Sequence, residues 1–188
     1  MKKSRDIRVI RTQTALLEAL VELIKTKKLS NISITELCTE AKINRNTFYY
    51  HFNNIYDFLE DHKQIVIDEL TQIPDINQTH SKQTLIEIFR ILKCHPNFMR
   101  VLISPNCDLD FFNDIFTLTS EKAKIDISNP HEITSSKDLM ICKYCNAGSN
   151  AVICAWILNG MRESPEEIAD IISQVSRKGA ITLLFPNE

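Results

Sequence analysis

The sequence predicts an all-α fold of about nine helices, in which an N-terminal three-helix helix-turn-helix domain precedes a larger helical domain. Three observations support this prediction. Apolar residues recur at helical spacing along most of the 188-residue chain. Only three glycines interrupt the chain, and 44% of its residues are apolar, which is enough to bury a core. Two serine–glutamate pairs, beginning at Ser33 and Ser164, have the spacing of a capping box that starts a helix.

A first helix is predicted from about residue 6 to residue 27 by apolar residues at helical spacing. These residues are Ala15, Leu16, Ala19, Leu20, Leu23 and Ile24. We expect this helix to support the two short helices that follow it.

Residues 32 to 52 predict two short helices joined by a tight turn. Ser33 is placed to cap a helix over about residues 34 to 41, because Glu36 completes the capping box. Asn44 is a good N-cap for a second helix over about residues 45 to 52. Only Lys42 and Ile43 remain for the turn, so the two helices must cross steeply, as they do in a helix-turn-helix DNA-binding motif.

The second short helix is predicted to have a buried face and a polar face. Phe48 and Phe52 form its inner stripe. At about 100° per residue, Asn46 and Tyr50 point farthest from Phe48. The flanks carry Arg45, Thr47, Tyr49 and His51. This face offers amides, hydroxyls and a guanidinium but no acid, which suits contact with phosphates and base edges. The alternative is an ordinary solvated helix face, although Glu and Lys are more usual there.

A fourth helix is predicted from about residue 55, because Asn54 and Asp57 mark its start, to the residue before Pro74. The polar stretch 74–80 is the expected linker. Prolines and turns then separate helices at about 81–94, 96–103 and 109–124, and a loop is expected at 126–136. We place the DNA-binding domain at 1–53 and the second domain at 54–188, with the helix at about 55–73 connecting them.

The last two helices are predicted at about 137–159, closed by Gly160, and at about 165–184, opened by Ser164 and Pro165. We expect them to be antiparallel. Both carry wide apolar faces, formed by Ala151, Val152, Ala155, Trp156 and Leu158 on one and by Ile168, Ile171, Ile172, Val175 and Leu183 on the other. Such faces favour contact with a partner chain, whereas the alternative is packing inside one subunit.

Positive charge is concentrated beside the helix-turn-helix. The whole chain has a net charge of −2, but residues 1–51 carry ten Lys and Arg against five acids, a balance of +5, and the remainder carries twelve against nineteen, a balance of −7. Lys2, Lys3, Arg5, Arg8 and Arg11 form a cationic arm. We expect the arm either to meet DNA phosphates or to be a frayed solubilising terminus.

Residues from about 10 to 60 resemble the DNA-binding domain of the TetR family of bacterial transcription regulators. The resemblance is carried by Ser33-Ile34, Leu37-Cys38, Ala41, Ile43-Asn44, Thr47, Phe48-Tyr49 and His51-Phe52. Two positions depart from the family pattern. Lys42 replaces a turn glycine, where a left-handed backbone is expected to cost a non-glycine residue about 1 kcal/mol. Ile55 replaces a lysine that contacts a phosphate in relatives.

The resemblance implies how DNA is bound. Arg45, Asn46, Thr47 and Tyr50 would reach base edges or nearby backbone, and Ser33, Thr35, Tyr49 and His51 would hold phosphates. The segment WILNGMRESPEEIADII resembles the end of some TetR-family C-terminal domains, which implies a homodimer through the last two helices. A dimer would place two reading helices about one turn of B-DNA apart, so the target would be a near-palindrome.

The family also implies a small-molecule effector that binds among the central helices, tilts the fourth helix and releases the DNA. Side chains that could line its pocket are Phe89, Met99, Phe112, Phe116, Met140, Tyr144 and Trp156. Aromatic residues at helical spacing are more often plain core. The resulting prediction is a homodimeric repressor; the alternative is a TetR-like co-activator or interaction protein that acts mainly through a protein partner.

Other functional classes find little support in the sequence. There is no Ser-His-Asp spacing, glycine-rich phosphate loop or metal-binding His pair, so we expect neither an enzyme nor a cofactor. Cys142 and Cys145 form a CxxC that could bind zinc or respond to oxidation, or could simply pack as thiols. No apolar run approaches the roughly 20 residues that span a bilayer, so we expect a cytoplasmic protein without membrane contact.

Overall fold

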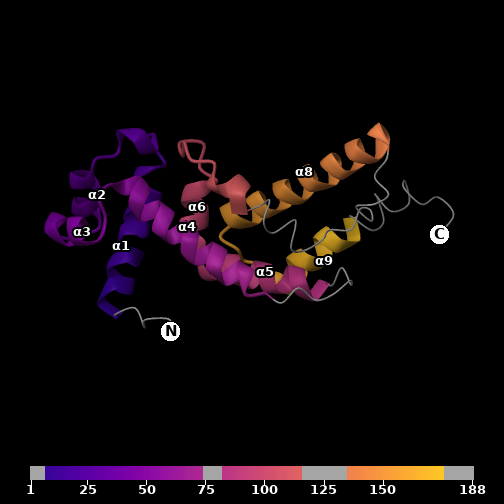
Figure 1. Cartoon of the computed structure of the whole chain (residues 1–188), viewed down its shortest axis with the longest axis horizontal. Helices are drawn as coiled ribbons and strands as arrows, with labels where there is room; N and C mark the ends of the chain where they lie inside the picture. The colour runs from indigo at the N-terminus through magenta and orange to yellow at the C-terminus, as the bar shows by residue number, and fades with distance from the viewer. Residues whose placement is uncertain (1–6, 74–81, 116–134, 176–188) are drawn as a thin grey trace. The chain divides into compact units, whose positions relative to one another are not determined.

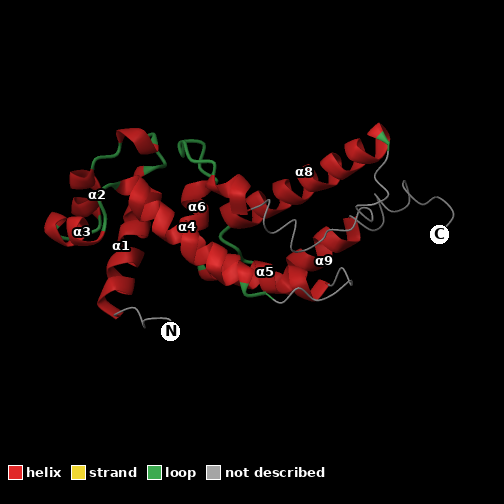
Figure 2. Cartoon of the chain, viewed as in Figure 1, coloured by secondary structure: helices red, strands yellow, loops and turns green. Residues whose placement is uncertain are grey.

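In the computed structural model of the chain, the structure describes residues 7–73, 82–115 and 135–175. Every regular element in these ranges is helical (Figure 2), and the predicted all-α fold is confirmed. None of the described helices is long and apolar enough to cross a membrane. The chain divides into two compact units, Met1–Ile67 with His95–Phe112, and Asp68–Cys94 with Asn113–Glu188.

The first unit holds the predicted helix-turn-helix (Figure 1). Its elements are α1 (Ile7–Leu23), the short 3-10 helix η1 (Leu29–Asn31), α2 (Ile34–Glu40), α3 (Arg45–His51), most of α4 (Ile55–Thr71), and α6 (Pro96–Leu102). Helix α1 packs against α2 and α6, and α2 packs against α3. The long first helix therefore packs directly on the first of the two short helices, and the second short helix packs on the first.

Three phenylalanines join α3 to α4. Phe48 and Phe52 of α3 and Phe58 of α4 are buried, and the ring centroids of Phe52 and Phe58 are 5.0 Å apart. The Phe48 ring lies 5.7 Å from Phe52 and 6.3 Å from Phe58. We call these three residues the phenylalanine cluster. It continues through the buried His62 of α4, whose ring lies 4.8 Å from Phe58, to Phe98 of α6.

The turn between α2 and α3 has the hydrogen bonds of a Schellman motif. The amide of Ile43 donates to Cys38 O at 2.9 Å, and the amide of Lys42 donates to Thr39 O at 3.1 Å. Lys42 has φ 56°, so the predicted left-handed backbone at this position is confirmed. Glycine usually occupies this position because any side chain is strained there.

Helix α1 ends at Leu23, before the predicted boundary at about residue 27. A contact distant in sequence explains the difference. The Asn106 side-chain amide donates to Ile24 O at 2.8 Å, and Asn106 O accepts from the Leu29 amide at 2.9 Å. Asn106 therefore satisfies backbone groups that would otherwise need further helix or water.

Helix α4 begins as predicted. Asn54 Oδ1 accepts from the Asp57 amide at 2.8 Å, and Asp57 Oδ2 accepts from the Asn53 amide at 2.9 Å. These side-chain bonds satisfy donors at the helix start. The helix ends in the second unit, just before the residues predicted as a linker.

The second unit contains α5 (Lys82–Cys94), α8 (Ser136–Leu158) and α9 (Pro165–Val175). The chain reverses after α8, and α9 runs back in the opposite direction, packed on α5 and α8 (Figure 1). The predicted capping box is present: Glu167 N donates to Ser164 Oγ at 3.2 Å, and Ser164 N donates to Glu167 Oε2 at 2.7 Å. Ion pairs Arg90–Glu166 and Lys82–Asp170 join α5 to α9.

Some predicted elements lie partly outside the described residues. Of the helix predicted at 109–124, residues 109–115 are described, and those from Phe111 to Ile115 are helical. The predicted loop at 126–136 lies almost wholly outside, and α8 already begins at Ser136. The helix predicted to reach residue 184 is described up to Val175.

Replacing Phe48 by alanine should remove the centre of the phenylalanine cluster. We expect Phe48→Ala to lower the free energy of unfolding by about 3–5 kcal/mol, because the side chain is fully buried. The matched control Tyr50→Ala, on the exposed face of the same helix, should change it by less than about 0.5 kcal/mol. Urea denaturation followed by circular dichroism measures both, and similar losses in the two variants would contradict the assigned faces.

Replacing Lys42 by glycine should stabilise the chain. Glycine adopts φ 56° without strain, so we expect Lys42→Gly to raise the free energy of unfolding by about 0.5–1 kcal/mol, after allowing for the greater freedom of glycine in the unfolded chain. Lys28→Gly, at an exposed position with an ordinary negative φ of −63°, should not stabilise. A lower melting temperature for Lys42→Gly than for the unmodified chain would refute the strain argument.

Candidate nucleic-acid interface

Helix α3 separates an anchored face from an exposed one. Phe48 is 0% exposed, whereas Tyr50 is 84% exposed and Asn46 is also exposed. The other predicted DNA-binding residues of this helix are exposed as well. We call the exposed set the reader face: Arg45, Asn46, Thr47, Tyr49, Tyr50 and His51.

The reader face is held in shape by local contacts. Asn44 caps the helix, because its Oδ1 accepts from the Asn46 amide at 2.8 Å, as predicted. The Arg45 guanidinium lies 5.9 Å from the centre of the Tyr49 ring, within the range of a cation–π contact. The Tyr50 and His51 rings meet edge to face at 4.8 Å. These contacts order several side chains before any partner is bound.

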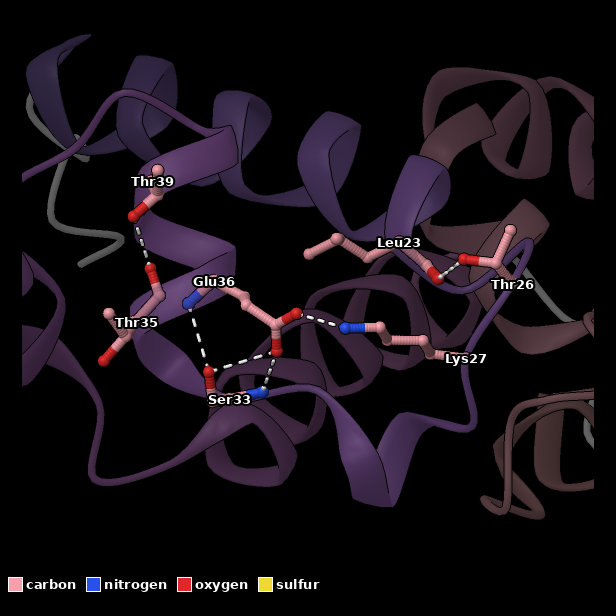
Figure 3. Close-up of polar contacts among 7 residues, drawn as sticks. All are labelled: Leu23, Thr26, Lys27, Ser33, Thr35, Glu36 and Thr39. Carbon is pink, nitrogen blue, oxygen red and sulfur yellow. Dashed lines mark hydrogen bonds and ion pairs between the residues drawn. The ribbon is translucent and has the colours of Figure 1, made fainter.

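The start of α2 is closed by the predicted capping box (Figure 3). Glu36 N donates to Ser33 Oγ at 3.1 Å, and the Ser33 amide donates to Glu36 Oε2 at 3.3 Å. Glu36 also forms an ion pair with Lys27. This pair and the hydrogen bonds from Ser33 lower the pKa of the Glu36 carboxyl below its ordinary value. The lowered pKa favours the charged form of the Glu36 carboxyl, and Lys27 balances this negative charge at the helix start.

Two predicted phosphate-binding residues lie at this helix start. Ser33 and Thr35 are both exposed. The Thr35 side chain points away from the capping box, while its carbonyl accepts from Thr39 Oγ1 at 2.8 Å (Figure 3). The hydroxyl of Ser33 is hydrogen-bonded to the Glu36 carboxylate, so the hydroxyl of Thr35 is the more available of the two for a phosphate.

Lys27 is a residue that sequence reasoning missed. It lies in the turn after α1, nine residues before Glu36, and the short helix η1 intervenes. Neither helical nor strand periodicity connects the two positions. Only the folded turn brings the ammonium to the carboxylate.

The candidate effector-pocket residues fall in different environments. Phe89 and Trp156 are buried in the second unit, with their ring centroids 5.8 Å apart. Met99 is buried in the first unit, and Phe112 is half-buried there. Met140 and Tyr144 are 67% and 77% exposed on α8, so they do not line a closed cavity of their own chain. Phe116 lies outside the described residues.

The described cysteines are free thiols. Cys145 of α8 is buried, and nothing is described of the Cys142 side chain. Burial raises the pKa of Cys38 in α2, which favours its neutral thiol. Within the described ranges, no three His, Cys, Asp or Glu side chains gather as a metal site.

Comparison with known proteins agrees with this architecture. Residues 79–178, more than half of the chain, match the TetR family model described as "Transcriptional regulator C-terminal region". The uncharacterized HTH-type transcriptional regulator YxbF of Bacillus subtilis (strain 168) is 23% identical over 176 residues. That match covers 89% of this chain and 45% of YxbF, so the chain spans less than half the length of this relative.

A solved structure has the same fold. The dihydroxyacetone kinase operon activator DhaS superimposes with a TM-score of 0.52 and 21% identity, over 90% of this chain and 96% of DhaS. The helix-turn-helix of the first unit and the family match over the C-terminal region cover complementary parts of the sequence. The chain therefore belongs to the TetR family of transcription regulators.

Proposed function

We propose that this regulator is a homodimeric repressor that binds a near-palindromic operator and releases it when a small molecule binds. The observation that carries the proposal is the reader face of α3, where Tyr50 and Asn46 project opposite the buried Phe48. An acid-free helix face with amide, hydroxyl and guanidinium groups matches the donors and acceptors of a major groove. In this proposal residues 1–53 read the DNA.

Exposed apolar side chains on α8 and α9 support a dimer. Tyr144 and Leu158 of α8 are 77% and 70% exposed, and Ile171 and Val175 of α9 are 44% and 62% exposed. An isolated chain would leave these groups in water, whereas a second copy would bury them. Two α8–α9 pairs related by a two-fold axis would form a four-helix interface, with a self-complementary contact.

Two-fold symmetry then sets the target. The two α3 helices would lie about 34–36 Å apart and enter successive major grooves. Arg45, Asn46, Thr47 and Tyr50 are proposed to meet bases or nearby backbone, and Ser33, Thr35, Tyr49 and His51 to meet phosphates.

Release by an effector is proposed to pass through α4. This helix begins beside the reader in the first unit and ends in the second unit. An effector that binds one arrangement of residues 54–188 more tightly would shift the population of reader spacings and lower DNA affinity. The buried aromatic pair Phe89 and Trp156 is the proposed centre of the effector region.

A protein acting on chromosomal DNA in this way would work in the cytoplasm.

The second candidate is a co-activator or interaction protein that acts mainly through a protein partner. Two observations favour it: Ile55, at the start of α4, is buried and uncharged, and DhaS, which has the same fold, is named an activator. A promoter fusion measured in the presence and absence of the protein distinguishes the candidates, because a repressor lowers expression when it alone is supplied.

Removing the outward side chains of α3 should weaken selective DNA binding. We expect Asn46→Ala with Tyr50→Ala to weaken binding to a duplex from beside the protein's own gene by about 30-fold or more, because each lost base contact is worth about 1–3 kcal/mol. Binding to a scrambled duplex should change much less. Gel shifts at fixed salt measure both, with Asn159→Ala of the second unit as control. Undiminished selectivity would reject the reader face.

An acid in the proposed interface should separate the subunits. We expect Ile171→Glu to weaken dimerisation by at least ~100-fold, because an unpaired carboxylate would be buried. Light scattering over a concentration series measures the mass. Gln72→Glu, which adds the same charge at an exposed position just after α4, should leave the mass unchanged. A dimer that persists in Ile171→Glu would refute the α8–α9 interface.

A further inference from the structure

The Schellman motif after α2 requires a left-handed backbone at Lys42, but nothing in the described residues explains why a lysine stands there instead of glycine. Two described residues other than glycine have positive φ, Met161 at 53° and Lys42 at 56°. Met161 is 3% exposed, so burial of its side chain compensates for the strain. Lys42 is exposed and gains no such burial. The backbone hydrogen bonds of the turn would form equally well with glycine, so the lysine side chain gains nothing from the fold in return for the strain. Such a residue is a reason to look for a functional contact.

The ammonium of Lys42 also differs from those of two nearby exposed lysines, because it forms no ion pair within the described ranges. Lys25 and Lys27 of the same unit are exposed, yet each forms an ion pair, with Glu22 and Glu36 respectively. Lys42 forms no ion pair with any residue in the described ranges. Its charge is therefore available to a partner outside the chain.

The position of Lys42 in the fold indicates what kind of partner its charge could contact. It occupies the turn that leads directly into α3, two residues before the capping Asn44. The next cation is Arg45 of the reader face, and α3 contains no acid. Of the two acids of α2, Glu36 is paired with Lys27, and Glu40 forms no ion pair with Lys42 in the described ranges. If α3 enters a major groove, as proposed, an exposed cation at the start of this helix lies near the phosphate backbone that flanks the groove.

We propose that Lys42 binds a backbone phosphate beside the groove entered by α3, and that this contact compensates in the complex for strain borne by the free protein. The inference rests on the proposed reading of DNA by α3. It differs from a surface lysine kept for solubility, because it links a gain in stability on substitution to a loss of DNA affinity.

Three full-length variants separate charge from backbone strain. Lys42→Gly removes both, Lys42→Asn removes the charge at a position that asparagine tolerates, and Lys42→Arg keeps the charge. Fluorescence anisotropy is measured over a salt series with a duplex from beside the protein's own gene and with a scrambled duplex. Thermal unfolding is measured on the same samples.

We expect Lys42→Gly and Lys42→Asn to weaken binding to both duplexes, by about 3- to 10-fold at moderate salt. The slope of log affinity against log salt should become shallower by about 0.9 for each lysine lost, or about 1.8 for a dimer. Lys42→Arg should keep the affinity and the slope. Lys42→Gly should melt at a higher temperature than the unmodified protein while binding DNA more weakly, a combination that damage to the fold cannot produce.

Normal affinity and slope in Lys42→Gly would overturn the inference, and so would a loss in Lys42→Arg as large as that in Lys42→Gly. In either result the unmodified protein still binds its duplex, and the proposed function stands. An unmodified protein that binds neither duplex would instead reject the proposed function together with the phosphate contact.

Discussion

The packing of the phenylalanine cluster is the constraint on which the orientation of the reader face depends. Helix α3 has only seven residues, too few to persist in water without tertiary support. Its orientation is therefore set by Phe48 and Phe52 against Phe58 of α4. Once the rings are fixed, helical geometry alone directs Asn46 and Tyr50 outward. A shift of α4 would move the reader with it, because the cluster belongs to both helices.

Polar side chains stabilise the ends of the two short helices that the apolar core orients. The two short helices leave many backbone donors unpaired, and Ser33, Glu36 and Asn44 satisfy part of them with side chains. Glu36 places a negative charge on this part of the unit, which would oppose a polyanionic ligand. Lys27 neutralises this charge locally, because the two side chains form an ion pair.

Local signals in the sequence predicted most of the fold. Both capping boxes, the cap at Asn44, the start of α4 and the left-handed backbone at Lys42 depend on neighbouring residues, and all are present. What was missed depends on contacts far apart in sequence. The early end of α1 requires Asn106, and the charge balance of α2 requires Lys27. The roles of the reader residues and of the effector region stay predictions, since exposure and burial do not identify a ligand.

Because Asn106 bonds to backbone groups just after α1, the first unit cannot be transferred to another protein as one continuous segment. The first unit is not one continuous stretch, because α6 and the loop after it complete the same core and hydrogen-bond network as the N-terminal helices. A cassette cut after α4 would leave the Ile24 carbonyl and the Leu29 amide without these partners. A chimaera that takes the proposed DNA-reading unit from this protein therefore has to include both separated segments.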